Sequence, residues 1–116
     1  MICTGAVPNS DLSVLYRGAL GFAMPSLYEG FGLPTLDAMA SGVPVMSSNR
    51  SSLPEVAGNA ALYFDPESVE EMSMAMERLI TDGALRQQLV ALGRERVKQF
   101  SWESCARATL AALRSL

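Results

Sequence analysis

The stretch from Pro25 to Asp37 concentrates residues that are able to bind a polar ligand. Its two glycines, Gly30 and Gly32, leave room for a ligand to approach the backbone closely. Two carboxylates, Glu29 and Asp37, stand eight positions apart, one before the glycines and one after them. A carboxylate accepts two hydroxyl hydrogen bonds at once, and charge-assisted bonds are about twice as strong as neutral ones. The pair therefore suits the recognition of a polyol.

The same residues also have ordinary structural explanations. Asp37 fits the early part of a helix, where it complements the helix dipole, and Glu29 fits a solvated loop. Leu33 is expected to cap a helix whose first residue is Pro34, and leucine has no oxygen that accepts from the first N–H groups. Such an uncapped start leaves those groups free for phosphate or sugar oxygens. The glycine pattern matches neither a dinucleotide-binding fingerprint nor a Walker loop.

Strands alternating with helices are expected to position this stretch. Four short apolar runs predict strands of a parallel sheet that is covered on both faces: Met1–Thr4, Leu20–Met24, Val43–Ser47 and Ala60–Phe64. Helix signals lie between the runs, at Asn9-Ser10-Asp11, at Pro34 with Gly42 as the stop, and at Ser52-Leu53-Pro54-Glu55, which has capping-box spacing. This order predicts βαβ units, and it places Pro25–Asp37 at the carboxyl end of the sheet, where open α/β sheets bind ligands.

The composition changes near residue 66. All six prolines and seven of the nine glycines lie in residues 1–66, and residues 67–116 predict three successive helices. The first begins at Ser68-x-x-Glu71, and the second spans roughly 84–99 with Arg86, Arg94 and Arg96 outward. Ser101 caps the third. Its apolar stripe predicts a buried face, on which Cys105 is expected to be a small buried hydrophobe.

Length and charge exclude several classes of protein. With 116 residues, 49% of them apolar, the chain fits one globular domain or part of one. Nine basic against twelve acidic residues argue against nucleic-acid binding, and the absence of histidine excludes histidine-based catalysis and zinc sites. No apolar run is long enough for a membrane span, and the first residues do not resemble a signal peptide, so we expect a cytoplasmic protein.

The motif Glu29-Gly30-Phe31-Gly32-Leu33-Pro34 followed by Asp37 resembles the E-x7-E signature of retaining glycosyltransferases of the GT4 family (glycosyl transferases group 1). The resemblance continues in family order through Leu15-Tyr16-Arg17, Pro25-Ser26 and residues 38–45, 53–58 and 100–103. Because it spans essentially the whole chain, it is far more specific than one motif. It implies an α/β fold, with residues 1–116 forming a single partial Rossmann-like domain from the C-terminal half of a GT-B enzyme.

The resemblance also implies a donor site for a nucleoside-diphosphate sugar of the GDP-mannose or UDP-glucose type, with no metal and no further cofactor. Glu29 would be the catalytic residue that contacts the sugar hydroxyls, with Ser26 nearby. Asp37 stands where the family usually has a glutamate on the ribose, and it is one methylene shorter. The backbone that would run along the sugar and diphosphate belongs to Gly30, Phe31, Gly32 and Leu33.

Asn49, Arg50 and Glu55 lie after the third predicted strand, Val43–Ser47. Asn49 and Arg50 follow a predicted strand, so they face either the cleft or the surface. Glu55 stands three residues after Ser52, and we expect it to cap a helix.

By the same resemblance, the family's basic residues for the diphosphate and its acceptor domain lie upstream of the matched segment. We therefore expect a partial domain that has no transferase activity alone and that self-associates through an exposed sheet edge. Two alternatives remain open at this point: a free-standing, non-catalytic module that binds a nucleotide or a partner protein, and an expressed remnant without function. Weaker sugar-nucleotide binding by Glu29→Ala would favour the donor site.

Overall fold

The computed structural model describes residues 1–116, and its centre is a parallel sheet of three strands in the order β1-β2-β3. The strands are β1 (Phe22–Met24), β2 (Val45–Ser48) and β3 (Ala61–Phe64). In the register, Val45 lies opposite Phe22 on one side and opposite Ala61 on the other. The carboxyl ends of all three strands therefore lie at the same end of the sheet, as the βαβ pattern predicts.

Six helices surround or extend from the sheet: α1 (Asn9–Gly18), α2 (Leu33–Ala40), α3 (Leu53–Ala57), α4 (Val69–Thr81), α5 (Gly83–Val97) and α6 (Trp102–Arg114). Successive residues of β2 point to opposite faces, so Val45 and Met46 belong to two different core clusters. The Val45 cluster is closed by α2 and α3, and the Met46 cluster by α4 and α5. Crossing a membrane would need a longer and more apolar helix than any of these six.

The predicted strand at Met1–Thr4 is wrong. Residues 1–5 lie outside the sheet, and Met1 and Ile2 are fully exposed. An apolar run becomes a strand where a neighbouring backbone pairs with it and other side chains cover it, and these residues have neither. The other three expected strands are confirmed, with ends that differ by at most two residues.

Some of the helix boundaries lie where the local sequence signals predict them, and others do not. Gly42 ends α2 with φ +76°, and the N–H groups of Gly42 and Val43 donate to the carbonyls of Met39 and Ala38, both at 3.0 Å. This Schellman pattern confirms the predicted stop. The helix predicted from Asn9-Ser10-Asp11 is present as α1, but none of these three side chains caps it, because Pro8 occupies the cap position.

The two later helices begin as expected, at Ser68 and Ser101, whose hydroxyls accept from Glu71 N and Ser104 N. The outward placement of Arg86 and Arg96 on α5 is wrong. Arg86 donates to the carbonyls of Leu79 and Ile80 at 2.8 and 2.7 Å, and Arg96 Nε donates to Val56 O at 2.9 Å. Both guanidinium groups donate hydrogen bonds to carbonyls at helix ends that would otherwise bond to solvent.

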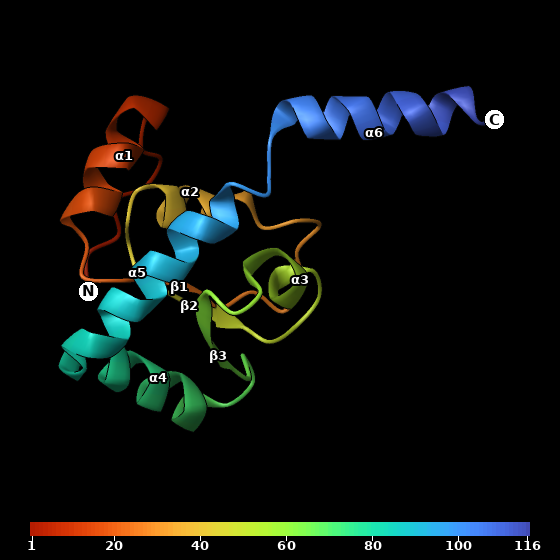
Figure 1. Cartoon of the computed structure of the whole chain (residues 1–116). Coiled ribbons are helices and arrows are strands. Elements are labelled where there is room, and N and C mark those ends of the chain that lie inside the picture. The colour runs from red at the N-terminus through yellow and green to blue at the C-terminus, as the bar shows by residue number, and fades with distance from the viewer.

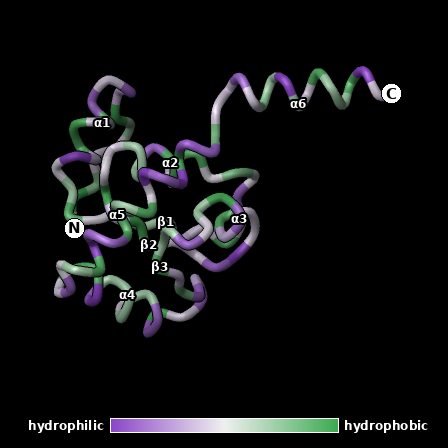
Figure 2. The backbone as a smooth tube through the Cα atoms, viewed as in Figure 1, coloured by the Kyte–Doolittle hydropathy of each residue, from purple (hydrophilic) through white to green (hydrophobic).

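The helix α6 runs away from the rest of the molecule and accounts for its long dimension of 50 Å (Figure 1). Every residue from Ser101 to Leu116 is exposed. The alternation of hydrophobic and hydrophilic residues predicted for this helix is present (Figure 2), but no other element covers the apolar side. The expectation that Cys105 is buried is therefore wrong.

Candidate functional site

Glu29 lies in the loop that leaves the carboxyl end of β1 and leads into α2. Its side chain is half-buried, and Oε1 accepts a hydrogen bond of 2.7 Å from Ser26 Oγ. The other carboxylate oxygen has no hydrogen bond within the chain. The structure thus brings together two residues of the predicted site, and it leaves one carboxylate oxygen free to accept from a ligand.

The start of α2 follows from the backbone at Gly32. Gly32 precedes the helix with φ +95°, and a Cβ there would lie 2.7 Å from Leu53 Cδ2. Glycine is therefore required by both conformation and space. Gly32 occupies the cap position that the sequence indicates for Leu33, and Leu33 is the first helical residue. As expected, no side chain caps this helix.

Four consecutive N–H groups at this helix start donate no hydrogen bond within the chain: those of Gly30, Phe31, Gly32 and Leu33. The first internal bond is the 3.0 Å bond from Thr35 N to Gly32 O. Phe31 and Leu33 are 43% and 47% exposed, and the Phe31 ring meets the edge of Phe100 at a centroid distance of 5.9 Å. Free donors therefore lie beside exposed apolar side chains.

Asp37 lies about one turn inside α2, where it is exposed and its side chain makes no hydrogen bond. Burial raises the pKa of Tyr16 on α1, and the charge of Asp37 raises that pKa further. Asp37 is thus close enough to α1 to act on it electrostatically. No contact joins Asp37 to Glu29, so the two carboxylates of the motif do not form one hydrogen-bonded pair.

Two residues of the site, Ser51 and Ser52, were missed by sequence reasoning. Both follow the carboxyl end of β2, and their hydroxyls donate to Glu29 O at 2.8 and 3.0 Å. Sequence reasoning assigned Ser52 to a capping box with Glu55, and this is wrong: Ser52 makes no cap bond, and the exposed Glu55 side chain makes no hydrogen bond. Two adjacent hydroxyls shortly after a predicted strand were the available signal.

Arg50 lies in the loop after β2, and two ion pairs hold its side chain. Its Nη2 donates to both carboxylate oxygens of Asp65 at 3.1 Å and to Glu67 Oε2 at 3.3 Å. The backbone N–H of Glu67 and the Arg50 guanidinium lower the pKa of Asp65. Asn49 is exposed, and its N–H donates to Phe64 O at 3.0 Å. Of the two open interpretations, the surface loop describes Arg50 better, because two carboxylates already satisfy its charge.

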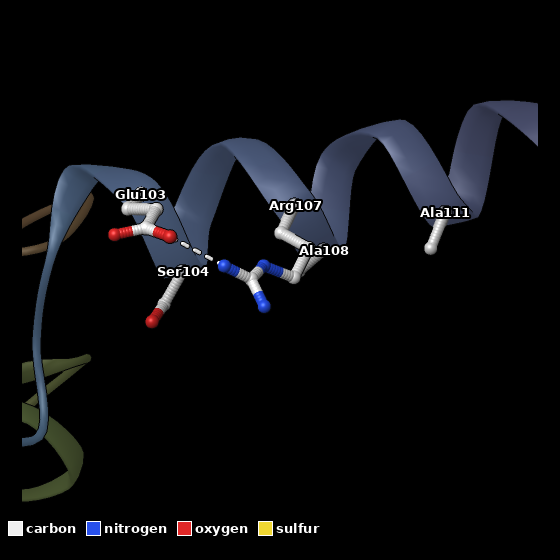
Figure 3. Close-up of a pocket in the computed structure, with 5 residues that line it drawn as sticks. All are labelled: Glu103, Ser104, Arg107, Ala108 and Ala111. Atoms are coloured by element: carbon white, nitrogen blue, oxygen red, sulfur yellow. Dashed lines mark hydrogen bonds and ion pairs between the residues drawn. The ribbon is translucent and has the colours of Figure 1, made fainter.

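A shallow hollow on α6 is a poorer candidate for a ligand site than the loop around Glu29. Figure 3 shows that the residues lining it all come from that one helix: Glu103, Ser104, Arg107, Ala108 and Ala111. The Arg107 side chain within it is already paired with Glu103. A hollow formed by one exposed helix holds a ligand from one side only, so the loop around Glu29 remains the candidate site.

Comparison with known proteins identifies the family of this chain. Residues 1–96 match the family described as glycosyl transferases group 1. The chain belongs to this family. Among curated glycosyltransferases, O-antigen chain mannosyltransferase B of Escherichia coli is 47% identical over 97% of the chain. The MMP alpha-(1->4)-mannosyltransferase of Mycolicibacterium hassiacum is 38% identical over 93% of it.

A solved structure shares the fold of this chain. Sucrose-phosphate synthase from Thermosynechococcus elongatus superposes on 97% of the chain with a TM-score of 0.85 and 32% sequence identity. The match covers 29% of that structure, and the chain likewise spans 29% and 27% of the two mannosyltransferases. The three-stranded α/β unit therefore corresponds to part of the GT-B C-terminal domain, as the resemblance implies.

Proposed function

We propose that this chain forms the donor side of a glycosyltransferase and binds a nucleoside-diphosphate sugar at the carboxyl ends of β1 and β2. The observation that supports this best is the loop before α2. There the Glu29 carboxylate, fixed by Ser26, adjoins four N–H groups without partners. A carboxylate suits sugar hydroxyls and a row of N–H groups suits phosphate oxygens, so the two halves of the loop match the two ends of a sugar diphosphate.

Glu29 is the proposed sugar-binding and catalytic residue. Ser26 occupies one of its carboxylate oxygens, and the other is unpaired. Two hydroxyls of the sugar can donate to the remaining lone pairs, and these bonds are charge-assisted. Since the carboxylate is half-buried, it faces less competition from water than a carboxylate on an open surface.

The diphosphate is proposed to lie along Gly30, Phe31, Gly32 and Leu33. Their N–H groups are free, and the positive end of the α2 dipole points the same way. Gly30 has open space around its Cα, and a Cβ added there would meet no atom within 4 Å, so a ligand reaches the backbone at this position. Donors fixed in this way also stabilise the charge that develops on the leaving diphosphate during transfer.

Asp37 is proposed to accept from the ribose hydroxyls of the donor. It is exposed and has no hydrogen-bond partner in the chain, so it is available for this contact. The relatives whose names specify mannosyl transfer favour GDP-mannose over UDP-glucose as the donor. Retention of configuration is part of the proposal and is supported by the family resemblance.

Transfer also needs an acceptor site and cations for the diphosphate. By the family resemblance both lie upstream of the matched segment, and Arg50, at the carboxyl end of β2, is already paired with Asp65 and Glu67. We therefore propose that the 116-residue chain alone binds the donor without transferring sugar, and that a further acceptor-binding domain completes the enzyme. Turnover by the purified chain with GDP-mannose and an acceptor would contradict this part of the proposal.

The donor site is tested by titrating the 116-residue chain with GDP-mannose, UDP-glucose, GDP and UDP, with binding followed by NMR or calorimetry. Glu29→Gln is expected to weaken binding of the preferred sugar nucleotide about tenfold or more, because a hydrogen bond to a charged group is worth ~1.5–3 kcal/mol. Binding of the free nucleoside diphosphate should change little. The control Glu77→Gln removes an exposed carboxylate on α4 and should leave both affinities unchanged.

The outcomes separate the alternatives clearly. If the wild-type chain binds none of the four compounds, the donor-site proposal is wrong. If it binds nucleoside diphosphates and sugar nucleotides equally, and Glu29→Gln changes neither, the nucleotide-binding module becomes the better interpretation.

A further inference from the structure

The hydroxyls of Ser51 and Ser52 contact the main chain of Glu29 at the carboxyl end of the sheet. Ser51 Oγ donates to Glu29 O at 2.8 Å and accepts from Glu29 N at 3.3 Å. Ser52 Oγ lies 3.0 Å from Glu29 O and 3.1 Å from Phe31 O. These contacts bridge 21 to 23 positions of sequence, so they join the loop after β2 to the loop after β1.

The backbone at Ser51 is unusual. With φ +56°, it is the one residue other than glycine that has a positive φ in the chain. Glycine adopts this conformation without the steric penalty that a Cβ brings. The Ser51 hydroxyl explains why serine stands here instead of glycine, because it makes two hydrogen bonds with Glu29.

Neither hydroxyl serves the helix that follows. Ser52 stands at the cap position of α3, yet its side chain makes no bond to the first turn. Ser51 lies before the helix, and its hydroxyl bonds with Glu29 alone. Both side chains are therefore directed to the Glu29 loop, and stabilisation of α3 does not explain them.

Glu29 is consequently fixed at its backbone and at its carboxylate. Ser51 and Ser52 satisfy both lone-pair positions of its carbonyl, Ser51 also meets its N–H, and Ser26 holds Oε1. Rotation of the Glu29 backbone would swing the carboxylate away from Ser26. A group that must meet sugar hydroxyls needs its position held to a fraction of an ångström.

We infer that Ser51 and Ser52 are positioning residues that hold Glu29 for the sugar portion of the donor and thereby set the preference of the site for a sugar nucleotide over the bare nucleoside diphosphate. This inference rests on the proposed donor site. The N–H groups proposed for the diphosphate belong to the next residues along, Gly30 to Leu33, and Ser51 bonds to none of them. Loss of the Ser51 hydroxyl should accordingly affect sugar recognition and leave diphosphate binding in place.

The test uses Ser51→Gly in the 116-residue chain, because glycine keeps the positive φ and removes the hydroxyl. The quantity measured is the ratio of Kd for GDP to Kd for GDP-mannose, and the same ratio for UDP and UDP-glucose. Ser51→Gly is expected to lower the ratio for the preferred donor about three- to tenfold, the factor that one hydrogen bond is worth. Kd for the free diphosphate should stay within about twofold of the wild-type value, since its proposed donors are untouched.

Three further variants make the result specific. Ser52→Ala should lower the same ratio, since its hydroxyl also bonds to Glu29 O. In the Glu29→Gln background, Ser51→Gly should have no further effect, because it acts through Glu29. Ser73→Ala removes an exposed hydroxyl of α4 that makes no hydrogen bond, and it should leave the ratio unchanged.

Failure of this inference is distinct from failure of the donor site. If Glu29→Gln lowers the ratio and both serine variants leave it at the wild-type value, the positioning role is wrong while the donor site stands. An equal loss for the diphosphate and the sugar nucleotide in Ser51→Gly would also overturn the inference, because it would show a general structural effect. If the wild-type chain binds no nucleotide, both fail together.

Discussion

Gly32 connects the loop around Glu29 to α2, and two independent constraints act on it. Its φ of +95° lies in the left-handed region, and an added Cβ would lie 2.7 Å from Leu53 Cδ2 in the core. Leu53 is fully buried at the start of α3, so it has little freedom to move aside. Gly30, two residues earlier, has neither constraint. The two glycines of the motif thus have different roles, one in folding and one in access for a ligand.

Gly32→Ala is expected to lower the free energy of unfolding by at least about 1–2 kcal/mol, because a side chain in the left-handed region is disfavoured by that amount before the clash is added. Urea denaturation followed by circular dichroism measures this change. Gly30→Ala is the matched control and should stay within about 1 kcal/mol of wild type, because its Cβ would meet open space. Equal destabilisation by the two substitutions would contradict the left-handed backbone and the close approach to Leu53 at Gly32.

Among the helices, α3 is the shortest, and contacts from α5 hold it in place. The helix has five residues, so most of its carbonyls have no partner within it. Arg96 of α5 donates from Nε to Val56 O at 2.9 Å, from Nη2 to Glu55 O, and its guanidinium lies 5.1 Å from the centre of the Phe100 ring. Tyr63 of β3 donates to Gly58 O at 2.7 Å. Because α3 directly follows Ser51 and Ser52, these contacts also support the loop that holds Glu29.

Arg96→Ala is therefore expected to destabilise the protein by about 1–3 kcal/mol, through the loss of hydrogen bonds from a charged group and of the contact with Phe100. Arg96→Lys should recover little of this, because an ammonium group lacks the planar fork that reaches two carbonyls and covers a ring. Urea denaturation provides the measurement. Arg94→Ala, on the same helix, removes an exposed arginine that makes no hydrogen bond, and a comparable loss there would contradict the role given to Arg96.

The success of sequence reasoning about these elements depended on whether the signal was local. The Gly42 stop and the Ser68 and Ser101 caps depend on nearby residues, and they are confirmed. Ser52 has an equally good local capping signal, yet its hydroxyl bonds to residues more than twenty positions away. Arg96 likewise bonds to carbonyls forty positions away. Contacts of this kind depend on the tertiary fold, which local spacing does not describe.

At the candidate site, the sequence indicated the uncapped start of α2 and placed the glycine loop at the carboxyl end of a strand, and both are present. The family resemblance implied that Ser26 lies near the site, and the structure places its hydroxyl 2.7 Å from the Glu29 carboxylate, while its role toward a donor stays a prediction. The roles of Glu29 and Asp37 toward a donor stay predictions. Sequence reasoning did not identify Ser51, because its contacts depend on its positive φ and on a partner in another loop.

At the scale of the whole molecule, the sheet has two open edges. β1 and β3 each pair only with β2, and no residue of α1 or α6 is buried. Exposed edges and uncovered apolar helix faces favour association between chains. Self-association through a sheet edge stays a prediction, and light scattering at increasing concentration decides it.

The exposure of α6 leads to a prediction about unfolding. Every residue from Ser101 to Leu116 is exposed, so this segment buries almost no apolar surface against the sheet and its helices. A helix of 13 residues is also marginal in water without tertiary packing. Removal of residues 101–116 is therefore expected to leave the melting temperature of the remaining chain within about 2 °C of the full-length value, because the cooperative core loses no contact.

Thermal unfolding followed by circular dichroism compares the two chains, and Leu89→Ala shows the sensitivity of the assay. Leu89 is 5% exposed in the core cluster beside Met46, and its truncation should cost about 2–4 kcal/mol and lower the melting temperature by at least about 8 °C. A fall of more than about 4 °C on removal of α6 would correspond to roughly 1 kcal/mol of lost packing. That result would mean that the apolar stripe of α6 lies against the body of the molecule in solution, whereas an unchanged melting temperature leaves the stripe available to another surface.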